Sequence, residues 1–258
     1  MSNDHEGVGF FGKVPVRGDF VSRGLPSAFI DCWDRWLQGA ISCSREQLGQ
    51  RWLDYYLASP IWHFVLSAGI CGQRPWIGLL MPSVDRVGRH FPLTLASTLS
   101  PALQPRAALS RANNWFAVAE QLALSCLRDD FDLNRFEDTV KSHAFSSALV
   151  EVSNVEAEKV IELSRGEDLQ TSMRFLEFLL ERRPDFLIAG AGDTGRYTLW
   201  CTRGSEQVAA SVLMCQTLPP VEGFAAFLDG QWKRWGWREQ RMTLITDYGT
   251  RRVKRRDD

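Results

Sequence analysis

The sequence has no excess of charge of either sign and no long apolar run. Its 30 Lys and Arg residues are balanced by 31 Asp and Glu residues, which leaves a net charge of −1 at pH 7. A protein that binds nucleic acid through phosphate contacts needs a positive surplus, so this class is not expected. No apolar run approaches the ~18 residues of a membrane-spanning helix, and the polar start MSNDHEGVG is unlike a secretory signal. We therefore expect a cytoplasmic protein that does not insert into a membrane.

The chain also lacks a cysteine motif. Its six cysteines lie at positions 32, 43, 71, 126, 201 and 215, and no two of them form a C-x-x-C pair. Most lie in apolar runs such as SAGICG and SVLMCQ, where cysteine behaves as a small hydrophobic residue. Six cysteines permit several bridges, but a chain with an adequate core does not need a disulfide framework. We expect a reducing compartment and no bound metal.

What the sequence does have is material for a large core. Apolar residues make up 45% of the 258 residues, with 10 tryptophans and 15 phenylalanines among them. Apolar positions recur at three- and four-residue spacing from Ser27 to Ile41, which predicts an amphipathic helix. Ser44 and Gln47 fit a capping box, which predicts that a second helix starts there and ends before Pro60.

The pattern then changes to short apolar segments. Residues 61–70, 76–81 and 91–98 are separated by Gly, Pro or charged residues, and they predict strands that are covered on both faces. The clearest helical pattern of the sequence follows, from Leu109 to Cys126. Together these elements predict an α/β fold with a mixed sheet.

The C-terminal half predicts an extension of the same unit. We expect a helix over 154–165, and then further helices and two or three strands over TSMRFLEFLLERR, DFLIAGAG, RYTLWCTRG and VAASVLMC. A final helix is expected from Val221 to Trp232. No low-complexity linker divides the chain. The predicted organisation is an N-terminal region at 1–143, a C-terminal α/β portion at 144–240 and a polar, basic tail at 241–258.

The stretch MPSVDRVGRHFP, residues 81–92, places four charged or titratable side chains between two apolar runs. Asp85 and His90 could act as a base and an acid, or together with Asp19 could hold a divalent metal ion. The spacing D-x-x-x-x-H matches no established set of metal ligands or catalytic triad. A hydrolase or metal-dependent enzyme that uses these three residues is therefore one hypothesis.

Two other interpretations of the same stretch involve no catalysis. Gly88 and Asp85 could shape a loop in which Asp85 caps the turn and pairs with Arg86 or Arg89. Alternatively, the arginines could form a surface that recognises a partner protein, since arginine anchors interfaces well. The residues by themselves leave the structural loop, the interface and the enzyme open.

Two glycine-rich segments do not predict nucleotide sites. GFFGK at 9–13 lacks the four-residue spacer and the terminal Ser or Thr of a phosphate-binding loop. AGAGDTG at 189–195 contains G-x-G-x-x-G, but strand-like residues follow it instead of a helix, so it predicts a β-turn. His63 and His143 are interpreted as structural residues, and no serine has the G-x-S-x-G setting of a nucleophile. We predict no cofactor.

Four segments in order resemble one family. They are GFFGKVPVRGDFVSRGLP at 9–26, FIDCWDRWLQ at 29–38, LGQRWLDYYLASPIWHFVLSAGICG at 48–72 and WIGLLMPSVDRVGRHFPLT at 76–94. Together they resemble the TagF/ImpM family, which is associated with bacterial type VI secretion, and the resemblance covers roughly residues 7–135. Family members often carry tyrosine or a similar aromatic residue before the Phe-Pro pair. This chain has His90 there, which argues against a catalytic role for that histidine.

The resemblance implies a fold and a function. The implied fold is a three-layer α/β/α sandwich. The implied function is that of a cytoplasmic, non-enzymatic protein that restrains the secretion apparatus after translation, in concert with or parallel to its threonine kinase and phosphatase. The implied partner is the forkhead-associated scaffold protein of the system. Some relatives are fused to a serine/threonine phosphatase domain, but the chain has no D-G-x-x-G metal motif of that domain, so we do not transfer its activity.

Binding of this kind needs turns of fixed shape that carry charge. The segments GFFGKVPVRGD and PSVDRVGR supply both. We therefore expect residues 17–19 to lie within ~15 Å of residues 85–89, at one end of the sheet. The predicted charge cluster is Arg17, Asp19, Asp85, Arg86 and Arg89. Whether it is a structural network or an interface stays open, as does the oligomeric state.

Overall fold

The computed structural model of the chain describes residues 7–99, 112–143, 160–162, 173–176, 187–189, 196–240 and 244–245. The strands are β1 Val8–Gly12, β2 Val21–Arg23, β3 Trp62–Leu66, β4 Trp76–Met81, β5 Leu93–Thr98, β6 Val160–Glu162, β7 Met173–Leu176, β8 Leu187–Ala189, β9 Thr198–Thr202, β10 Ser211–Cys215, β11 Arg238–Gln240 and β12 Leu244–Ile245. The α-helices are α1 Ser27–Leu48, α2 Trp52–Leu57, α4 Asn113–Ser125, α5 Leu133–Ser142 and α6 Ala225–Asp229. The 3-10 helices are η1 Gly49–Arg51, η3 Val221–Gly223 and η4 Trp232–Trp235.

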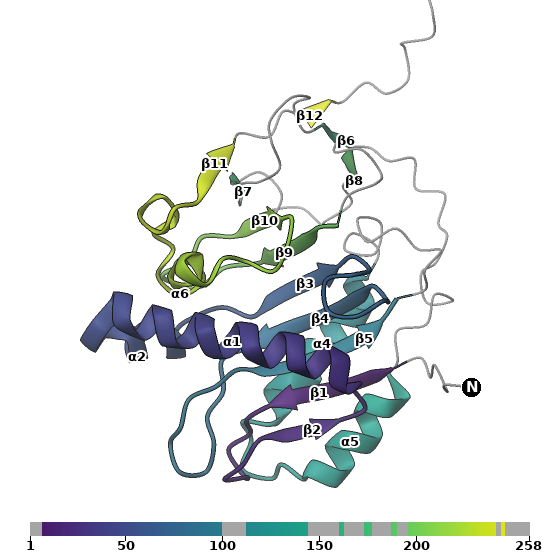
Figure 1. Cartoon of the computed structure of the whole chain (residues 1–258). Coiled ribbons are helices and arrows are strands. Elements are labelled where there is room, and N and C mark those ends of the chain that lie inside the picture. The colour runs from purple at the N-terminus through teal and green to yellow at the C-terminus, as the bar shows by residue number, and fades with distance from the viewer. Residues whose placement is uncertain are drawn as a thin grey trace, which may run out of the picture.

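Within these residues, the main sheet has nine strands in the order β11-β7-β10-β9-β3-β4-β5-β1-β2, and β12-β6-β8 form a smaller sheet (Figure 1). The pairs in the main sheet are antiparallel except β7 with β11, which is parallel, so the sheet is mixed. Strand β3 pairs with β4 on one side and with β9 on the other, which places Phe64 between Gly78 and Trp200. Strands from the C-terminal half of the chain therefore extend the N-terminal sheet.

The three central strands confirm the prediction from the apolar segments. Every residue of β3, β4 and β5 is buried, as expected for strands with both faces covered. Strand β5 begins at Leu93, directly after Pro92, and proline has no N–H group to donate to a neighbouring strand.

The helix α1 lies along one face of the sheet (Figure 1). Aromatic side chains make much of this contact. The buried residues of α1 recur at helical spacing and include Trp33 and Trp36, which confirms the predicted stripe. Trp33 is fully buried, stacks at 5.9 Å on Trp200 of β9, and donates its indole N–H to the Thr94 hydroxyl at 2.8 Å. The hydrogen bond satisfies the only polar group of this large side chain, so its full burial leaves no donor without a partner.

The opposite face of the sheet packs against α4 and α5. Side chains at alternate positions of the strands, such as Ile77 and Leu79 of β4, join one hydrophobic cluster with Phe116 of α4 and Phe136 of α5. The Phe136 ring lies edge-on to Phe10 of β1 at 4.9 Å. The alternation along each strand thus supplies two separate cores, one on each face.

The fold is therefore α/β with a mostly antiparallel sheet, and part of the expected architecture is confirmed. Helices pack on both faces of the sheet in the described ranges. The arrangement of the entire chain in three layers stays a prediction, and the predicted turn at 189–195 and the basic tail at 241–258 fall largely outside the described residues.

Three local predictions are wrong. The capping box at Ser44 does not start a helix, because Ser44 lies inside α1, where its hydroxyl accepts the Trp52 indole N–H at 2.9 Å. The helix expected over 154–165 is contradicted at Val160–Glu162, where β6 pairs with β8. The final helix is divided into η3, α6 and η4, and Gly230 with φ +70° ends α6.

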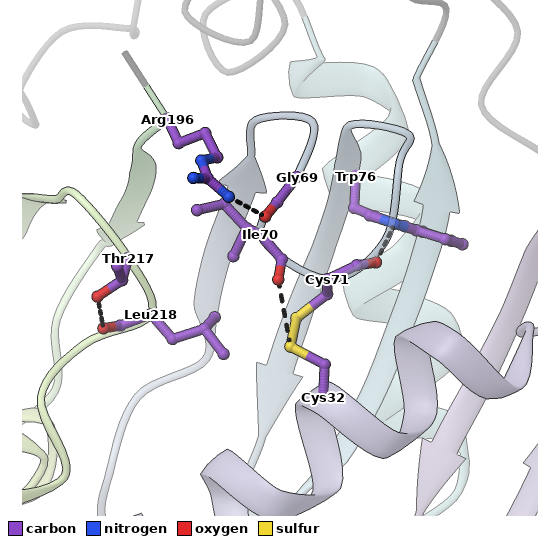
Figure 2. The surroundings of a disulfide bond; sticks show 8 residues. All are labelled: Cys32, Gly69, Ile70, Cys71, Trp76, Arg196, Thr217 and Leu218. Carbon is purple, nitrogen blue, oxygen red and sulfur yellow. Dashed lines mark hydrogen bonds between the residues drawn. A yellow bond between two sulfur atoms is a disulfide. The ribbon is translucent and has the colours of Figure 1, made fainter.

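The interpretation of the cysteines as small hydrophobic residues is corrected for two of the six. Cys32 of α1 and Cys71 of the β3–β4 loop form a disulfide across 39 residues of sequence (Figure 2). Their spacing carries no local signal, because the fold alone brings α1 against this loop. The remaining cysteines behave as predicted, and burial raises the pKa of the Cys126 thiol to about 12. No described helix has both the length and the apolar character needed to cross a membrane.

Candidate functional site

Two turns at one end of the sheet hold the predicted charge cluster. The first, residues 13–19, follows β1, and the second, residues 83–90, lies between β4 and β5. We call them the paired turns. Because β1 and β5 are antiparallel neighbours, the end of β1 and the start of β5 meet at the same edge. The backbone N–H of Arg86 donates to the Arg17 carbonyl at 2.9 Å, which confirms that the two segments lie together.

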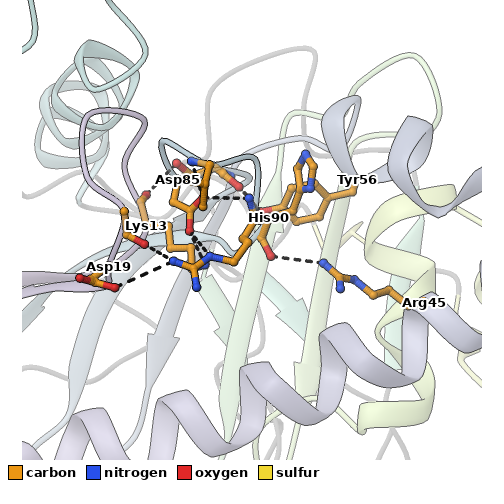
Figure 3. Close-up of polar contacts among 10 residues, drawn as sticks. Lys13, Asp19, Arg45, Tyr56, Asp85 and His90 are labelled. Atoms are coloured by element: carbon orange, nitrogen blue, oxygen red, sulfur yellow. Dashed lines mark hydrogen bonds and ion pairs between the residues drawn. The ribbon is translucent and has the colours of Figure 1, made fainter.

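The Asp85 carboxylate is the centre of the paired turns (Figure 3). Its side chain is fully buried and accepts four hydrogen bonds. Oδ1 accepts the backbone N–H groups of Val87 at 3.0 Å and Arg89 at 2.8 Å. Oδ2 accepts the Lys13 ammonium and the Arg89 Nε–H, each at 2.7 Å. The contacts within the second turn form the Asx-type turn that the sequence predicted. The contact from Lys13 ties the first turn to the same carboxylate.

These contacts fix the charge of Asp85. Burial by itself raises the pKa of the carboxyl, but the hydrogen bonds from Lys13, Arg89 and Val87 outweigh it and hold the pKa well below its ordinary value. The carboxylate is therefore ionised throughout the physiological range. Its acceptor positions are already used by protein donors, which suits a residue that shapes the turn.

Lys13 is the residue of this network that the prediction left out. Its side chain is 6% exposed, and its ammonium also lies 5.1 Å from the centre of the Phe20 ring. The sequence contained a signal for it, because Lys13 is the only charged residue in the apolar run VGFFGKVPV. A buried lysine needs a carboxylate partner, and here the partner lies 72 positions away in sequence.

Arg89 joins the two turns at the surface. Besides its contacts with Asp85, its Nη2 donates to the Gly18 carbonyl and lies 3.9 Å from the carboxylate of the fully exposed Asp19. Arg17 and Arg86 are exposed on the same turns. The five predicted residues are thus brought together, with one of them buried and four at the surface.

A second set of contacts anchors the turn 83–90 to the helices. The buried Tyr56 hydroxyl donates to the Ser83 carbonyl at 2.8 Å and accepts the Ser83 N–H at 2.9 Å. The Ser83 hydroxyl donates to the Lys13 carbonyl at 2.7 Å. Burial raises the pKa of Tyr56, which keeps its hydroxyl protonated and able to donate. The paired turns are therefore tied to each other and to α2, and Gly88 at φ +85° closes the second turn.

Comparison with known proteins identifies the family. The sequence profile of the TagF N-terminal domain, described as type VI secretion system-associated, matches residues 9–143. This range contains both paired turns and every residue of the network.

The chain belongs to the TagF family.

A solved structure supports the same relationship. PA0076 from Pseudomonas aeruginosa PAO1 is 32% identical to this chain and superposes with a TM-score of 0.66. The match covers 87% of this chain and 94% of PA0076. No curated protein matched the chain. The TagF resemblance of the sequence motifs is therefore confirmed, and this TagF protein is type VI secretion system-associated.

The residues of the enzyme hypothesis have different environments in this TagF protein. Asp19 is exposed and Asp85 is buried and fully hydrogen-bonded, while His90 packs against Trp52 and Tyr56. Burial and the positive charges of Arg45 and Lys13 lower the pKa of His90, although the Asp85 charge opposes this effect. Among the residues that the structure describes, no group of three or more His, Cys, Asp or Glu side chains is placed to hold a metal ion.

His63 occupies a separate position on the α4 side of the sheet. Its Nε2 lies 2.6 Å from the Glu120 carboxylate of α4, and its ring stacks on Phe116 at 4.0 Å. The hydrogen bond from His63 lowers the pKa of Glu120 against the opposing effect of burial. This arrangement fits the structural role predicted for His63.

Proposed function

We propose that this TagF protein is a non-enzymatic repressor of type VI secretion that acts after translation by binding the forkhead-associated scaffold protein of the system. Membership of the TagF family supports the link to type VI secretion. The repression and the partner are what the family resemblance implies. The paired turns are the surface that we propose for this binding.

The observation that carries the proposal is the state of Asp85. A general acid or base must exchange a proton near the working pH, and a metal ligand must have free lone pairs. Asp85 has a strongly lowered pKa and accepts four hydrogen bonds from within the protein. Its chemistry therefore suits a residue that holds the shape of a loop.

The surroundings of Asp85 supply what a binding surface needs. Arg17 and Arg86 project from turns whose backbones are hydrogen-bonded to each other, so the backbone that carries the two arginines is in place before a partner arrives. A preorganised surface loses less conformational entropy on binding than a flexible one. Arginine is also enriched among the residues that dominate binding energy at interfaces.

We propose a cytoplasmic location for this function. In that compartment thiols are kept reduced, so Cys32 and Cys71 would be unpaired there. The β3–β4 loop has other contacts that do not need the disulfide. The Trp76 indole N–H donates to the Cys71 carbonyl at 3.1 Å, and the Arg196 guanidinium donates to the Gly69 carbonyl at 3.2 Å (Figure 2). The paired turns lie in different segments, so the proposed binding does not depend on the disulfide.

The experiment is a binding titration with the purified scaffold protein. Wild type should bind, and Asp85→Asn should bind more weakly because the asparagine amide cannot accept all four hydrogen bonds that hold the turn. Asp130→Asn is the matched control, since Asp130 makes an exposed pair with Arg128 at 2.9 Å in the α4–α5 loop. The control should bind like wild type.

Secretion is measured in parallel in cells that lack the native gene. Arg86→Ala should relieve repression and weaken scaffold binding together, because both depend on one surface. Relief of repression with scaffold binding unchanged would contradict the proposal and would favour catalysis. Absence of binding by wild type would exclude this scaffold as the partner.

A further inference from the structure

Exposed apolar side chains gather around the paired turns. The described residues contain eight large apolar side chains that are exposed, and five of them lie at this end of the sheet. They are Val16 and Phe20 on and beside the first turn, Val87 on the second turn, and Leu53 and Leu57 on α2. Exposed single apolar residues are common, but several of them on the two turns and on the helix that anchors the second turn are typical of an interaction surface.

A pocket lies between the second turn and the helices α1 and α2, and Leu53 of this group lines it. It has a volume of about 480 Å³ and is lined by Arg45, Gly49, Gln50, Trp52, Leu53, Gly88, Arg89 and His90. One wall therefore comes from the second turn and the other from the end of α1 and the start of α2. Leu53 and Trp52 make the wall partly apolar.

The pocket is positively charged. Its lining contains two arginines and no carboxylate, and the lowered pKa of His90 favours the neutral form of that side chain. The Arg45 guanidinium lies 4.3 Å from the centre of the Trp52 ring, and its Nη2 donates to the His90 carbonyl at 3.5 Å (Figure 3). Within the described part of the chain, Arg45 forms no ion pair with a carboxylate, so its charge is available to a ligand.

Three features oppose an anion in this pocket, but within the described residues none of them is an ion pair with Arg45. The exposed Asp19 carboxylate lies 3.9 Å from Nη2 of Arg89. The C-terminal end of α1 carries a partial negative charge of about half a unit, which falls off within one turn. Asp85 is buried and already paired with Lys13 and Arg89. The guanidinium groups of Arg45 and Arg89 each carry a full positive charge at any physiological pH.

We propose that the paired turns and this pocket dock an acidic segment of a partner protein, with a carboxylate side chain between Arg45 and Arg89 and apolar side chains against Leu53 and Val87. This inference rests on the proposed function and adds the chemistry of the partner. The charge of the pocket selects an acidic segment, and the apolar residues around it select leucine-like neighbours. The fixed backbone of the paired turns makes the surface ready to bind without rearrangement.

Two variants test the proposal in the full-length protein. Arg45→Gln/Leu53→Gln changes the pocket, and Arg86→Gln/Val87→Gln changes exposed side chains of the second turn without removing a buried contact of Asp85. The matched control is Arg128→Gln/Leu124→Gln on the α4 side, because Leu124 is 41% exposed and Leu53 is 40% exposed. Thermal unfolding verifies that every variant is folded.

The first probe is a fluorescein-labelled peptide of alternating glutamate and leucine, followed by fluorescence anisotropy. Wild type should bind it and should bind the same peptide with glutamine in place of glutamate much more weakly. Each test variant should weaken binding of the acidic peptide by about tenfold or more, while the control changes it by less than about twofold. Equal binding of the two peptides, or equal binding by wild type and both test variants, overturns the proposal.

The second probe, the purified scaffold protein, separates this inference from the proposed function. If wild type binds the scaffold and both test variants bind it equally well, the docking surface at the paired turns is wrong, while binding of the scaffold by this protein stands. If wild type does not bind the scaffold, the proposed function is wrong, and the acidic peptide alone decides the docking surface. Loss of scaffold binding in both test variants, but not in the control, supports the two together.

Discussion

The buried ion pair between Lys13 and Asp85 predicts a large effect of a small substitution. Lys13→Met keeps most of the apolar stem of the side chain and removes its charge, so packing in the first turn is largely retained. Removing one partner of a buried ion pair commonly costs about 3–5 kcal/mol, because a charge is left without compensation. Here Asp85 keeps Arg89 and two backbone N–H groups as donors. The loss of stability is therefore closer to the free energy of one hydrogen bond to a charged group.

We therefore expect Lys13→Met to lower the free energy of unfolding by about 2 kcal/mol. In urea the unfolding midpoint should fall by about 1 M. Tryptophan fluorescence can follow the transition. The matched control is Lys141→Met, which removes the same charge from an ion pair with Glu137 at 2.8 Å, where the lysine side chain is 57% exposed. An exposed ion pair contributes little to stability, so the control should have the same urea midpoint as wild type.

A double variant completes the test. Because Lys13 and Asp85 interact directly, Lys13→Met/Asp85→Asn should be less destabilised than the sum of the two single variants. Equal midpoints for Lys13→Met and Lys141→Met would refute the reasoning. Strict additivity in the double variant would also refute it, since the two residues would then contribute independently.

Two further predictions concern the α4 side and the disulfide. Glu120 has a lowered pKa in the folded protein because of His63, so its contribution to stability is present above the ordinary glutamate pKa and is lost as pH falls through the lowered value. The difference in urea midpoint between wild type and Glu120→Gln should therefore shrink between about pH 5 and pH 3, and a constant difference would contradict this. The Cys32–Cys71 bridge closes 39 residues, which predicts up to about 4 kcal/mol of stabilisation in the oxidised protein. A reductant should lower the thermal midpoint of wild type and leave that of Cys32→Ser unchanged, whereas an unchanged wild type would contradict the prediction.

The elements that were predicted correctly are those whose pattern is local and strongly periodic. The stripe of α1 and the apolar runs of β3, β4 and β5 each fix a secondary structure and a buried face by themselves. The capping box at Ser44 is also local, but Ser44 lies on the buried face of α1 with Ala40 and Ile41, where its hydroxyl accepts the Trp52 indole N–H. Tertiary packing overrides the local signal in that case.

In the candidate site, too, some features could be predicted from the sequence and the long-range contacts could not. The proximity of the two turns was expected because a binding surface would need both segments, and it is confirmed. Asp85 also fixes its turn, as one interpretation held. Lys13 and Tyr56 were missed because their partners lie 72 and 27 positions away in sequence. Only the antiparallel pairing of β1 with β5 and the packing of α2 bring these partners together. Recognition of a partner by the exposed arginines stays a prediction.

The position of β3 has a consequence for work with shortened forms of this protein. A fragment that stops at residue 143, where the family match ends, would lose β9 and leave the buried, largely apolar β3 as an unprotected edge. It would also uncover Trp33 and Trp36, which Trp200 normally covers. Such an edge invites pairing between chains, so the fragment should aggregate when expressed alone. The boundary drawn from sequence similarity is therefore not a place where the polypeptide can be cut.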